Sequence, residues 1–247
     1  RAPTFRHLQY DQYKAGRKGM PDELASQMPI LKEVLAALNI PMYELDGWEA
    51  DDLIGTISRK CQAAGGDCVI VTGDKDSLQL VTDRTRVKLV STRMGQTTTK
   101  DMTPETFREQ YGFDPIHMID LKALMGDTSD NIPGVPGIGE KTALALISKF
   151  GSLQGVYDNI EDKAVKPGQR AKLTANRDKA DLSYMLGTIR RDAPIETDPN
   201  AYIRRPGDPA AAAQLLAALE MHKMVARWGL EEGAAPAAAA VSYTHLR

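Results

Sequence analysis

Two short apolar runs, CVIVTG (68–73) and VKLVST (87–92), constrain the fold of this chain more than any other feature. Runs of this length rich in valine predict strands buried on both faces, as in parallel sheets. The segment 46–66 precedes the first run and is predicted to be a helix, with Asp46 and Glu49 in capping-box spacing and a closing glycine pair. With PMYEL (41–45) as another short strand, the pattern predicts an α/β fold with a largely parallel central sheet flanked by helices.

The remaining segments are predominantly helical. Residues 22–38 space their leucines and a methionine by three and four, which predicts an amphipathic helix with a buried apolar stripe. From Thr103 onward the helical segments are TPETFREQYG, PIHMIDLKALMG, EKTALALISKFG and ADLSYMLGTIRRD, separated by Gly, Pro and Asp turns. We predict an α/β core over 1–102, a helical lobe over 103–229 and an alanine-rich tail over 230–247, whose VSYTHLR end matches no neighbouring pattern.

Composition excludes several classes of protein. No apolar run approaches the roughly 20 residues of a membrane span, and two cysteines without a C-x-x-C pair argue against zinc and for a reducing cytoplasm. The net charge, 31 − 33 = −2, does not by itself indicate nucleic acid. However, residues 1–20 are basic whereas residues 44–52 carry five acids, so different segments are expected to serve different ligands. The chain opens with Arg1, which indicates a fragment.

Seven acidic residues lie at predicted element ends. They fall in the first turn of the helix, after the strand CVIVTG and in the segment GDTSDN, and they are Glu49, Asp51, Asp52, Asp74, Asp76, Asp127 and Asp130. Each cluster alone is compatible with helix capping or turn formation. Together they would repel one another unless cations neutralised them, and ligand sets made only of oxygen favour Mg²⁺ or Mn²⁺. We therefore predict two divalent ions serving hydrolytic phosphoryl transfer.

The glycine-rich segment GVPGIGEKTA (134–143) is compatible with binding either of two phosphate groups, that of a nucleotide or that of the DNA backbone. A nucleotide P-loop requires lysine directly after the last glycine, but Glu140 stands between Gly139 and Lys141. DNA backbone suits the segment better, because glycines let the chain approach a phosphate and the amides opening the next helix point at it. The predicted DNA-binding residues here are Gly134, Gly137, Gly139, Lys141 and Thr142, and the alternative is a plain glycine turn between helices.

The basic segment YDQYKAGRKG (10–19) is a second candidate contact for nucleic acid. Lys14 and Arg17 are three residues apart, so a helical turn would place both on one face. Tyr10 and Tyr13 are available to stack on an unpaired base. The alternative is a solvated charged face.

Four stretches resemble the 5′-nuclease domain of bacterial DNA polymerase I, which is related to flap endonucleases. They are PTFRHLQYDQYKAGR, DGWEADDLIGT, VTGDKDSLQLV and LMGDTSDNIPGVPGIGEKTA, and the similarity covers roughly residues 1–230. The resemblance implies a flap-endonuclease-like fold, the seven acids as metal ligands, and GVPGIGEKTA as a helix–hairpin–helix clamp on duplex DNA with an associated K⁺. It also implies that Lys14 and Arg17 act catalytically on the scissile phosphate, and that Arg6 and Tyr13 contact DNA.

The resemblance implies a structure-specific 5′-3′ nuclease acting on 5′-flap or nicked DNA in primer removal and repair. The expected protein is a bacterial monomer associated with the nucleoid, with a polymerase domain as a possible continuation. Members of the family carry an N-terminal strand with an Asp and a second Asp shortly before the PTFR stretch, and this sequence, which begins RAPTFR, has neither. A catalytically silent DNA-binding module is therefore one alternative, and a PIN-type ribonuclease, which shares a similar acidic sheet edge, is another.

Overall fold

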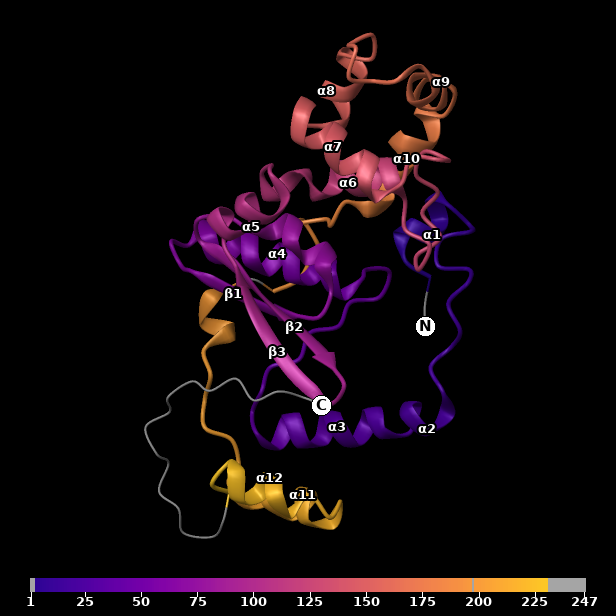
Figure 1. Ribbon diagram of the computed structural model, residues 1–247. Coiled ribbons are helices and arrows are strands. Elements are labelled where there is room, and N and C mark those ends of the chain that lie inside the picture. The colour runs from indigo at the N-terminus through magenta and orange to yellow at the C-terminus, as the bar shows by residue number, and fades with distance from the viewer. Residues whose placement is uncertain (1–2, 197, 231–247) are drawn as a thin grey trace. The chain divides into compact units, whose positions relative to one another are not determined.

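The computed structural model describes residues 3–196 and 198–230, and its chain divides into two compact units (Figure 1). The first joins Arg1–Arg17 to Glu44–Thr197, and the second joins Lys18–Tyr43 to Asp198–Arg247. Of the predicted tail over 230–247, residues 231–247 lie outside the described residues. The predicted boundary between residues 102 and 103 falls inside the first unit and stays a prediction.

The first unit contains a three-stranded sheet in the order β1-β2-β3. Strands β1 (Cys68–Thr72) and β2 (Thr85–Arg93) pair in parallel, so both apolar runs are confirmed as strands. Strand β3 (Gln96–Met102) pairs with β2 in antiparallel fashion through a turn at Met94 and Gly95, whose φ angles of 50° and 76° match a two-residue hairpin. The sequence QTTTKDM gave no apolar signal because β3 is mostly exposed.

The helix before β1 forms as predicted but begins differently. Helix α4 spans Ala50–Ala63, and its N-cap is Glu49 rather than Asp46, with Asp52 completing the capping box. Gly47 adopts a φ of 80°, which turns the chain between Asp46 and the helix. The shift matters for the site, because it makes the Glu49 backbone amide a donor to the Asp52 carboxylate (3.2 Å).

The predicted strand PMYEL is wrong. Residues 41–45 have no regular secondary structure. Pro41 has no N–H to donate to a ladder. The ring of Tyr43 packs on Tyr202 at 5.0 Å in the second unit, so side-chain packing rather than strand pairing holds this segment.

Helices build the rest of the first unit, as predicted. They are α5 (Pro104–Tyr111), α6 (Met118–Met125), α7 (Glu140–Phe150), α8 (Leu153–Asp158), α9 (Pro167–Ala175) and α10 (Arg177–Gly187), with short 3-10 helices at Lys75–Leu80 and Pro115–His117. Thr103 caps α5 and Pro104 occupies its first turn, which confirms the predicted start. Val87, Met102, Phe107, Leu124 and Ile147 share one buried core, so the sheet and the helices of this unit pack as one body.

The second unit is helical. It contains α2 (Asp22–Ala25), α3 (Gln27–Ala37), a 3-10 helix (Pro199–Tyr202), α11 (Pro209–Ala218) and α12 (His222–Arg227). The single helix predicted over 22–38 is interrupted at Ser26. Its apolar stripe is not buried as expected: Leu24 is 47% exposed and the other stripe residues are half-buried, whereas Val34, outside the stripe, is 6% exposed. The reason is that Ala212 and Leu216 of α11 cover only the end of α3 near Val34.

The loop between α6 and α7 depends on glycine for packing. Gly134 has a φ of 58°, and its N–H donates to Ser183 Oγ (2.8 Å). A Cβ at Gly134 would lie 2.3 Å from the Gly126 backbone nitrogen. The expectation that Gly134 lets the chain approach a phosphate is therefore wrong, because this glycine is buried against the end of α6.

A matched pair of alanine substitutions tests this conclusion. We expect Gly134→Ala to lower the free energy of unfolding by at least about 2 kcal/mol, because it adds left-handed strain to the clash with Gly126. Gly139→Ala meets no heavy atom within 4 Å at a φ of −90° and should lose less than about 1 kcal/mol. Urea denaturation of both variants measures the difference, and equal losses would contradict the packing role.

Candidate metal and phosphate site

A buried ion pair lies beneath the site. Arg6, on the short helix α1 (Phe5–Gln9), is 3% exposed, and its Nη1 and Nη2 each donate to Asp52 at 2.8 Å. Asp52 is 0% exposed, and the same guanidinium also donates to the carbonyls of Leu186 (2.9 Å) and Thr188 (2.6 Å). Neither prediction for these residues holds in this structure: the Arg6 donors are engaged within the protein, and Asp52 is sealed from an incoming ion.

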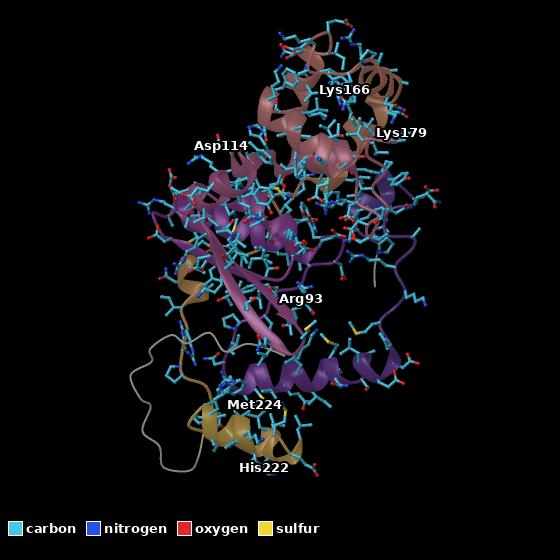
Figure 2. The ribbon with its side chains drawn as sticks, viewed as in Figure 1. Arg93, Asp114, Lys166, Lys179, His222 and Met224 are labelled. Atoms are coloured by element: carbon cyan, nitrogen blue, oxygen red, sulfur yellow. The ribbon has the colours of Figure 1, made fainter. Side chains whose placement is uncertain are left out.

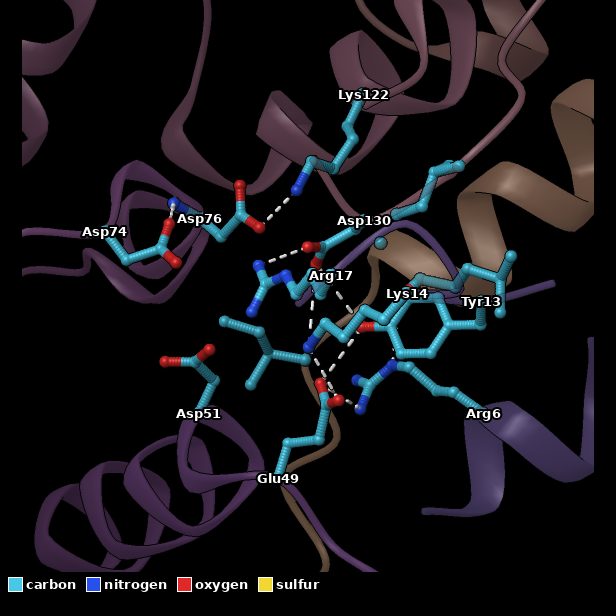
Figure 3. Close-up of a pocket in the computed structure, with 14 residues that line it drawn as sticks. Arg6, Tyr13, Lys14, Arg17, Glu49, Asp51, Asp74, Asp76, Lys122 and Asp130 are labelled. Carbon is cyan, nitrogen blue, oxygen red and sulfur yellow. Dashed lines mark hydrogen bonds and ion pairs between the residues drawn. The ribbon is translucent and has the colours of Figure 1, made fainter. Parts of the chain in front are cut away.

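Above this pair is a small polar cavity of about 60 Å³ (Figure 3). Acids from separate elements reach it: Glu49 and Asp51 from the start of α4, Asp74 and Asp76 from the turn after β1, and Asp130 from the loop after α6. The turn after β1 lies at the C-terminal end of a parallel strand, where open α/β sheets bind ligands. The predicted convergence of acids is thus present for these five side chains.

Three carboxylates lie within range of a single ion. Ligand oxygens of Asp76, Asp127 and Asp130 are all within 4.8 Å of one another. Asp74 is exposed and accepts a hydrogen bond from the Asp76 N–H (2.9 Å), which caps the 3-10 helix. The donor set consists of carboxylate oxygens alone, which fits a hard divalent cation.

Basic side chains neutralise these acids. Lys14 Nζ donates to Glu49 Oε1 (2.7 Å) and lies 3.6 Å from Asp130 Oδ2, while Arg17 pairs with Asp130 Oδ1. Residues 11–16 form successive turns rather than the expected helical turn, and the Lys14 N–H donates to the Asp130 carbonyl (2.9 Å) at a φ of 57°. Lys14 and Arg17 still reach the same cavity, because Asp130 anchors both.

Tyr13 has a different role from the one expected. It is 3% exposed, its hydroxyl donates to Glu49 Oε2 (3.1 Å), and its ring meets His7 edge-on at 5.3 Å. Burial and the nearby Glu49 carboxylate raise the pKa of this phenol, so it remains a donor. Stacking of Tyr13 on a base is wrong for this conformation, since no ring face is open.

Lys122 is the site residue that sequence reasoning missed. It is 7% exposed on α6, pairs with Asp76 Oδ2, and lies 2.8 Å from Asp127 Oδ2. The available signal was a lysine in the otherwise apolar helix MIDLKALM, apart from Asp120. A buried lysine is rare unless it is paired with an acid.

The pKa values show that the neutralisation is uneven. Burial, followed by the charges of Asp74 and Asp76, raises the pKa of Asp51 to about 6. Burial also acts on Asp127, but hydrogen bonds from Lys122 and Ser129 outweigh it and lower its pKa to about 2. Asp51 therefore has no adequate cationic partner, and an additional cation would stabilise its ionised form.

The glycine-rich segment lies apart from the residues that line the cavity. Gly139 is the N-cap of α7, Lys141 is exposed, and the Thr142 N–H bonds to the Gly139 carbonyl (3.0 Å). Gly137 has a φ of 81°, and its carbonyl accepts from Lys172 Nζ (3.1 Å) on α9. Figure 2 places Lys166 and Lys179 on the helical part of the first unit, and Lys172 is the basic side chain that contacts this segment.

Comparison with known proteins decides the family. A family model for the 5′-3′ exonuclease N-terminal resolvase-like domain matches residues 1–112, and a model for the 5′-3′ exonuclease C-terminal SAM fold matches residues 113–210. The chain belongs to the 5′-3′ exonuclease family. The family confirms the predicted flap-endonuclease-like fold, a sheet with helices followed by a helical part. The expected largely parallel sheet is wrong in detail, because β3 pairs with β2 in antiparallel fashion and makes the sheet mixed.

Relatives of this chain include DNA polymerase I of Bacillus caldotenax, 46% identical over 195 residues, or 78% of this chain and 22% of that protein. DNA polymerase I of Caldicellulosiruptor bescii is 41% identical over 232 residues, or 94% of this chain and 27% of that protein. The chain thus spans about a quarter of the length of these relatives.

Solved structures share the fold. T5 5′-exonuclease with bound zinc ions matches with a TM-score of 0.61 at 21% identity, covering 91% of this chain and 80% of that chain. The catalytic core of Rad2 in complex with DNA substrate matches with a TM-score of 0.59 at 21% identity, covering 92% of this chain and 75% of that chain.

The buried pair generates a stability prediction. We expect Arg6→Ala to lower the free energy of unfolding by about 3–5 kcal/mol, because Asp52 would be left as a buried charge without its partner. Arg108→Ala is the matched control: Arg108 and Asp114 form an exposed pair, so this substitution should leave the free energy of unfolding nearly unchanged. Urea denaturation distinguishes the two, and a loss at Arg6 no larger than at Arg108 would show that the pair is not structural.

Proposed function

We propose that the protein is a divalent-metal-dependent 5′-3′ nuclease that hydrolyses phosphodiester bonds of 5′-flap or nicked DNA, in primer removal and repair. The observation that carries the proposal is the convergence of acids from α4, the turn after β1 and the loop after α6 on one cavity. Membership of the 5′-3′ exonuclease family supports the reaction class. The two structural neighbours, described with zinc ions and with DNA substrate, support metal and DNA as ligands.

The proposed ligands of the metal ions are the acids that reach the cavity or the three-carboxylate cluster: Glu49, Asp51, Asp74, Asp76, Asp127 and Asp130. Asp52 instead holds the Glu49 backbone and Arg6 in place. Two Mg²⁺ or Mn²⁺ ions would supply the positive charge that phosphoryl transfer requires. With the acids occupied by metal, Lys14 and Arg17 are the proposed donors to the scissile phosphate, because both already lie in the cavity.

The proposed duplex contact is the start of α7. Gly139 and Lys141 offer helix-opening backbone amides and an exposed cation to a phosphate, Thr142 offers its hydroxyl, and Lys172 beside Gly137 adds charge. K⁺ at this segment belongs to the same proposal. Phosphate contacts of this kind position DNA without reading its sequence.

The remaining partner proposals are that the protein is monomeric, acts in the bacterial cytoplasm at the nucleoid, and belongs to a longer chain with a polymerase domain. The DNA polymerase I relatives support the last of these. The α/β and helical division at residues 102 and 103 is part of the same proposal. Across residues 3–196 and 198–230, no helix is both long enough and apolar enough to cross a membrane.

A single substitution tests the metal-dependent reaction. We expect Asp74→Asn to reduce the single-turnover rate on a 5′-flap substrate by on the order of 10²-fold or more, because an amide oxygen is a weaker metal ligand than a carboxylate. Asparagine keeps the acceptor for the Asp76 N–H, so folding should be preserved. Asp83→Asn, an exposed acid outside the cavity, is the control and should cleave at the parental rate.

Duplex binding in EDTA separates the alternatives. Parent and Asp74→Asn should bind DNA alike there, since the proposed duplex contact lies elsewhere. A parent chain that binds DNA but never cleaves it with Mg²⁺ or Mn²⁺ is a silent binding module. Cleavage of RNA in preference to flap DNA would indicate a PIN-type ribonuclease instead.

The start of α7 generates a separate prediction about salt. Lys141→Ala should weaken binding to all duplex sequences alike and reduce the log–log salt slope by ~0.9, the value of one phosphate contact. Lys149→Ala, on the last turn of the same helix where Lys149 pairs with Asp162, is the control and should leave the slope unchanged. Fluorescence anisotropy over a salt series measures both, and a sequence-dependent loss at Lys141 would contradict a phosphate contact.

A further inference from the structure

Lys122 lies where a metal ion would be expected to contact its ligands. Its ammonium pairs with Asp76 (Figure 3). It also lies 2.8 Å from Asp127 Oδ2, and these acids supply two of the three clustered carboxylates. The third, Asp130, is held by Arg17 and approached by Lys14. Each acid of the cluster therefore already has a basic partner from the protein itself.

The packing around Lys122 leaves space for its long side chain. The side chain is 7% exposed, and its stem crosses Gly187 at the end of α10, where an added Cβ would lie 3.1 Å from Lys122 Cδ. A buried ammonium is stable only with opposite charge beside it. The missing side chain at Gly187 and the two acids thus keep the Lys122 side chain in one position.

We propose that Lys122 is a built-in counter-cation that competes with the divalent metal for Asp76 and Asp127. Without metal, Lys122 offsets the repulsion among the clustered carboxylates and stabilises the folded site. A metal ion that takes the same oxygens must displace the ammonium from at least one of them. Lys122 is therefore a positioning residue that lowers metal affinity while it preserves the empty site. This inference rests on the metal site under the proposed function.

The competition predicts opposite effects on stability and on metal affinity. Lys122→Met keeps the stem and removes the charge, so the metal-free chain should unfold at lower urea. Its affinity for Mn²⁺ should rise by at least about tenfold, because a positive charge no longer opposes the ion at close range. A lysine that only supports the fold would, when removed, leave metal affinity unchanged or weaken it.

The experiment is isothermal titration of Mn²⁺ into the metal-free 247-residue chain and its variants, with circular dichroism to follow folding. Lys122→Gln is the second variant: it keeps an N–H donor for the acids without the charge, and should also bind Mn²⁺ more tightly. Lys179→Met is the matched control, since it makes the same charge change at an exposed position of α10. It should bind Mn²⁺ as the parent does.

The outcomes separate this inference from the proposed function. If the parent chain binds no Mn²⁺, the metal site itself is wrong and the inference falls with it. If the parent binds and Lys122→Gln binds with equal or lower affinity, the metal site stands and the competition is overturned. A folded Lys122→Met with equal or lower affinity overturns it as well. If Lys122→Met folds only in the presence of Mn²⁺, the Mn²⁺ affinity of Lys122→Gln decides between competition and a purely structural role.

Discussion

Repulsion among carboxylates is the constraint around which this site is built. Glu49, Asp51, Asp74, Asp76 and Asp130 reach one small cavity, and Asp127 joins two of them within range of a single ion. Charges of one sign gathered in this way oppose folding unless they are offset. The protein offsets them with side chains from separate elements: Lys14 and Arg17 from the turns after α1, and Lys122 from inside α6. Burial and acidic neighbours raise the pKa of Asp51 to about 6, and burial raises the pKa of Asp76 even beside Lys122.

The Arg6–Asp52 pair supports this arrangement from below. It joins α1 to the first turn of α4 and, through the carbonyls of Leu186 and Thr188, to the end of α10. Asp52 also accepts from the Glu49 N–H, so the residue that begins α4 is fixed toward the cavity. The acids that face the cavity and the acid beneath it thus have different tasks: the first are available to ligands, and the second sets their position. The proposed nuclease chemistry depends on this division.

Much of the fold was predictable because local patterns matched the tertiary result. The apolar runs became β1 and β2, Thr103 capped α5 with Pro104 behind it, and EKTALALISKF became α7. Predictions failed where the contacts of a segment come from residues distant in the sequence, which no local pattern can contain. PMYEL is no strand, since Tyr43 packs on Tyr202. The stripe predicted over 22–38 is not fully buried, since α11 covers α3 only near Val34. Strand β3 was missed because its exposed side chains carry no apolar alternation.

The sequence by itself determined which residue types stand at the ends of the helices and strands. Acids follow a strand and begin a helix, basic residues precede these acids along the chain, and a glycine-rich turn precedes α7. Only the tertiary structure decided which of them face the same cavity. Asp51 and Asp52 are adjacent, but successive side chains on a helix point about 100° apart, so Asp51 lines the cavity while Asp52 is buried with Arg6. Lys122 could be placed among the acids only by the packing of α6 against α10, because its partners are distant in sequence and no local periodicity encodes such a contact.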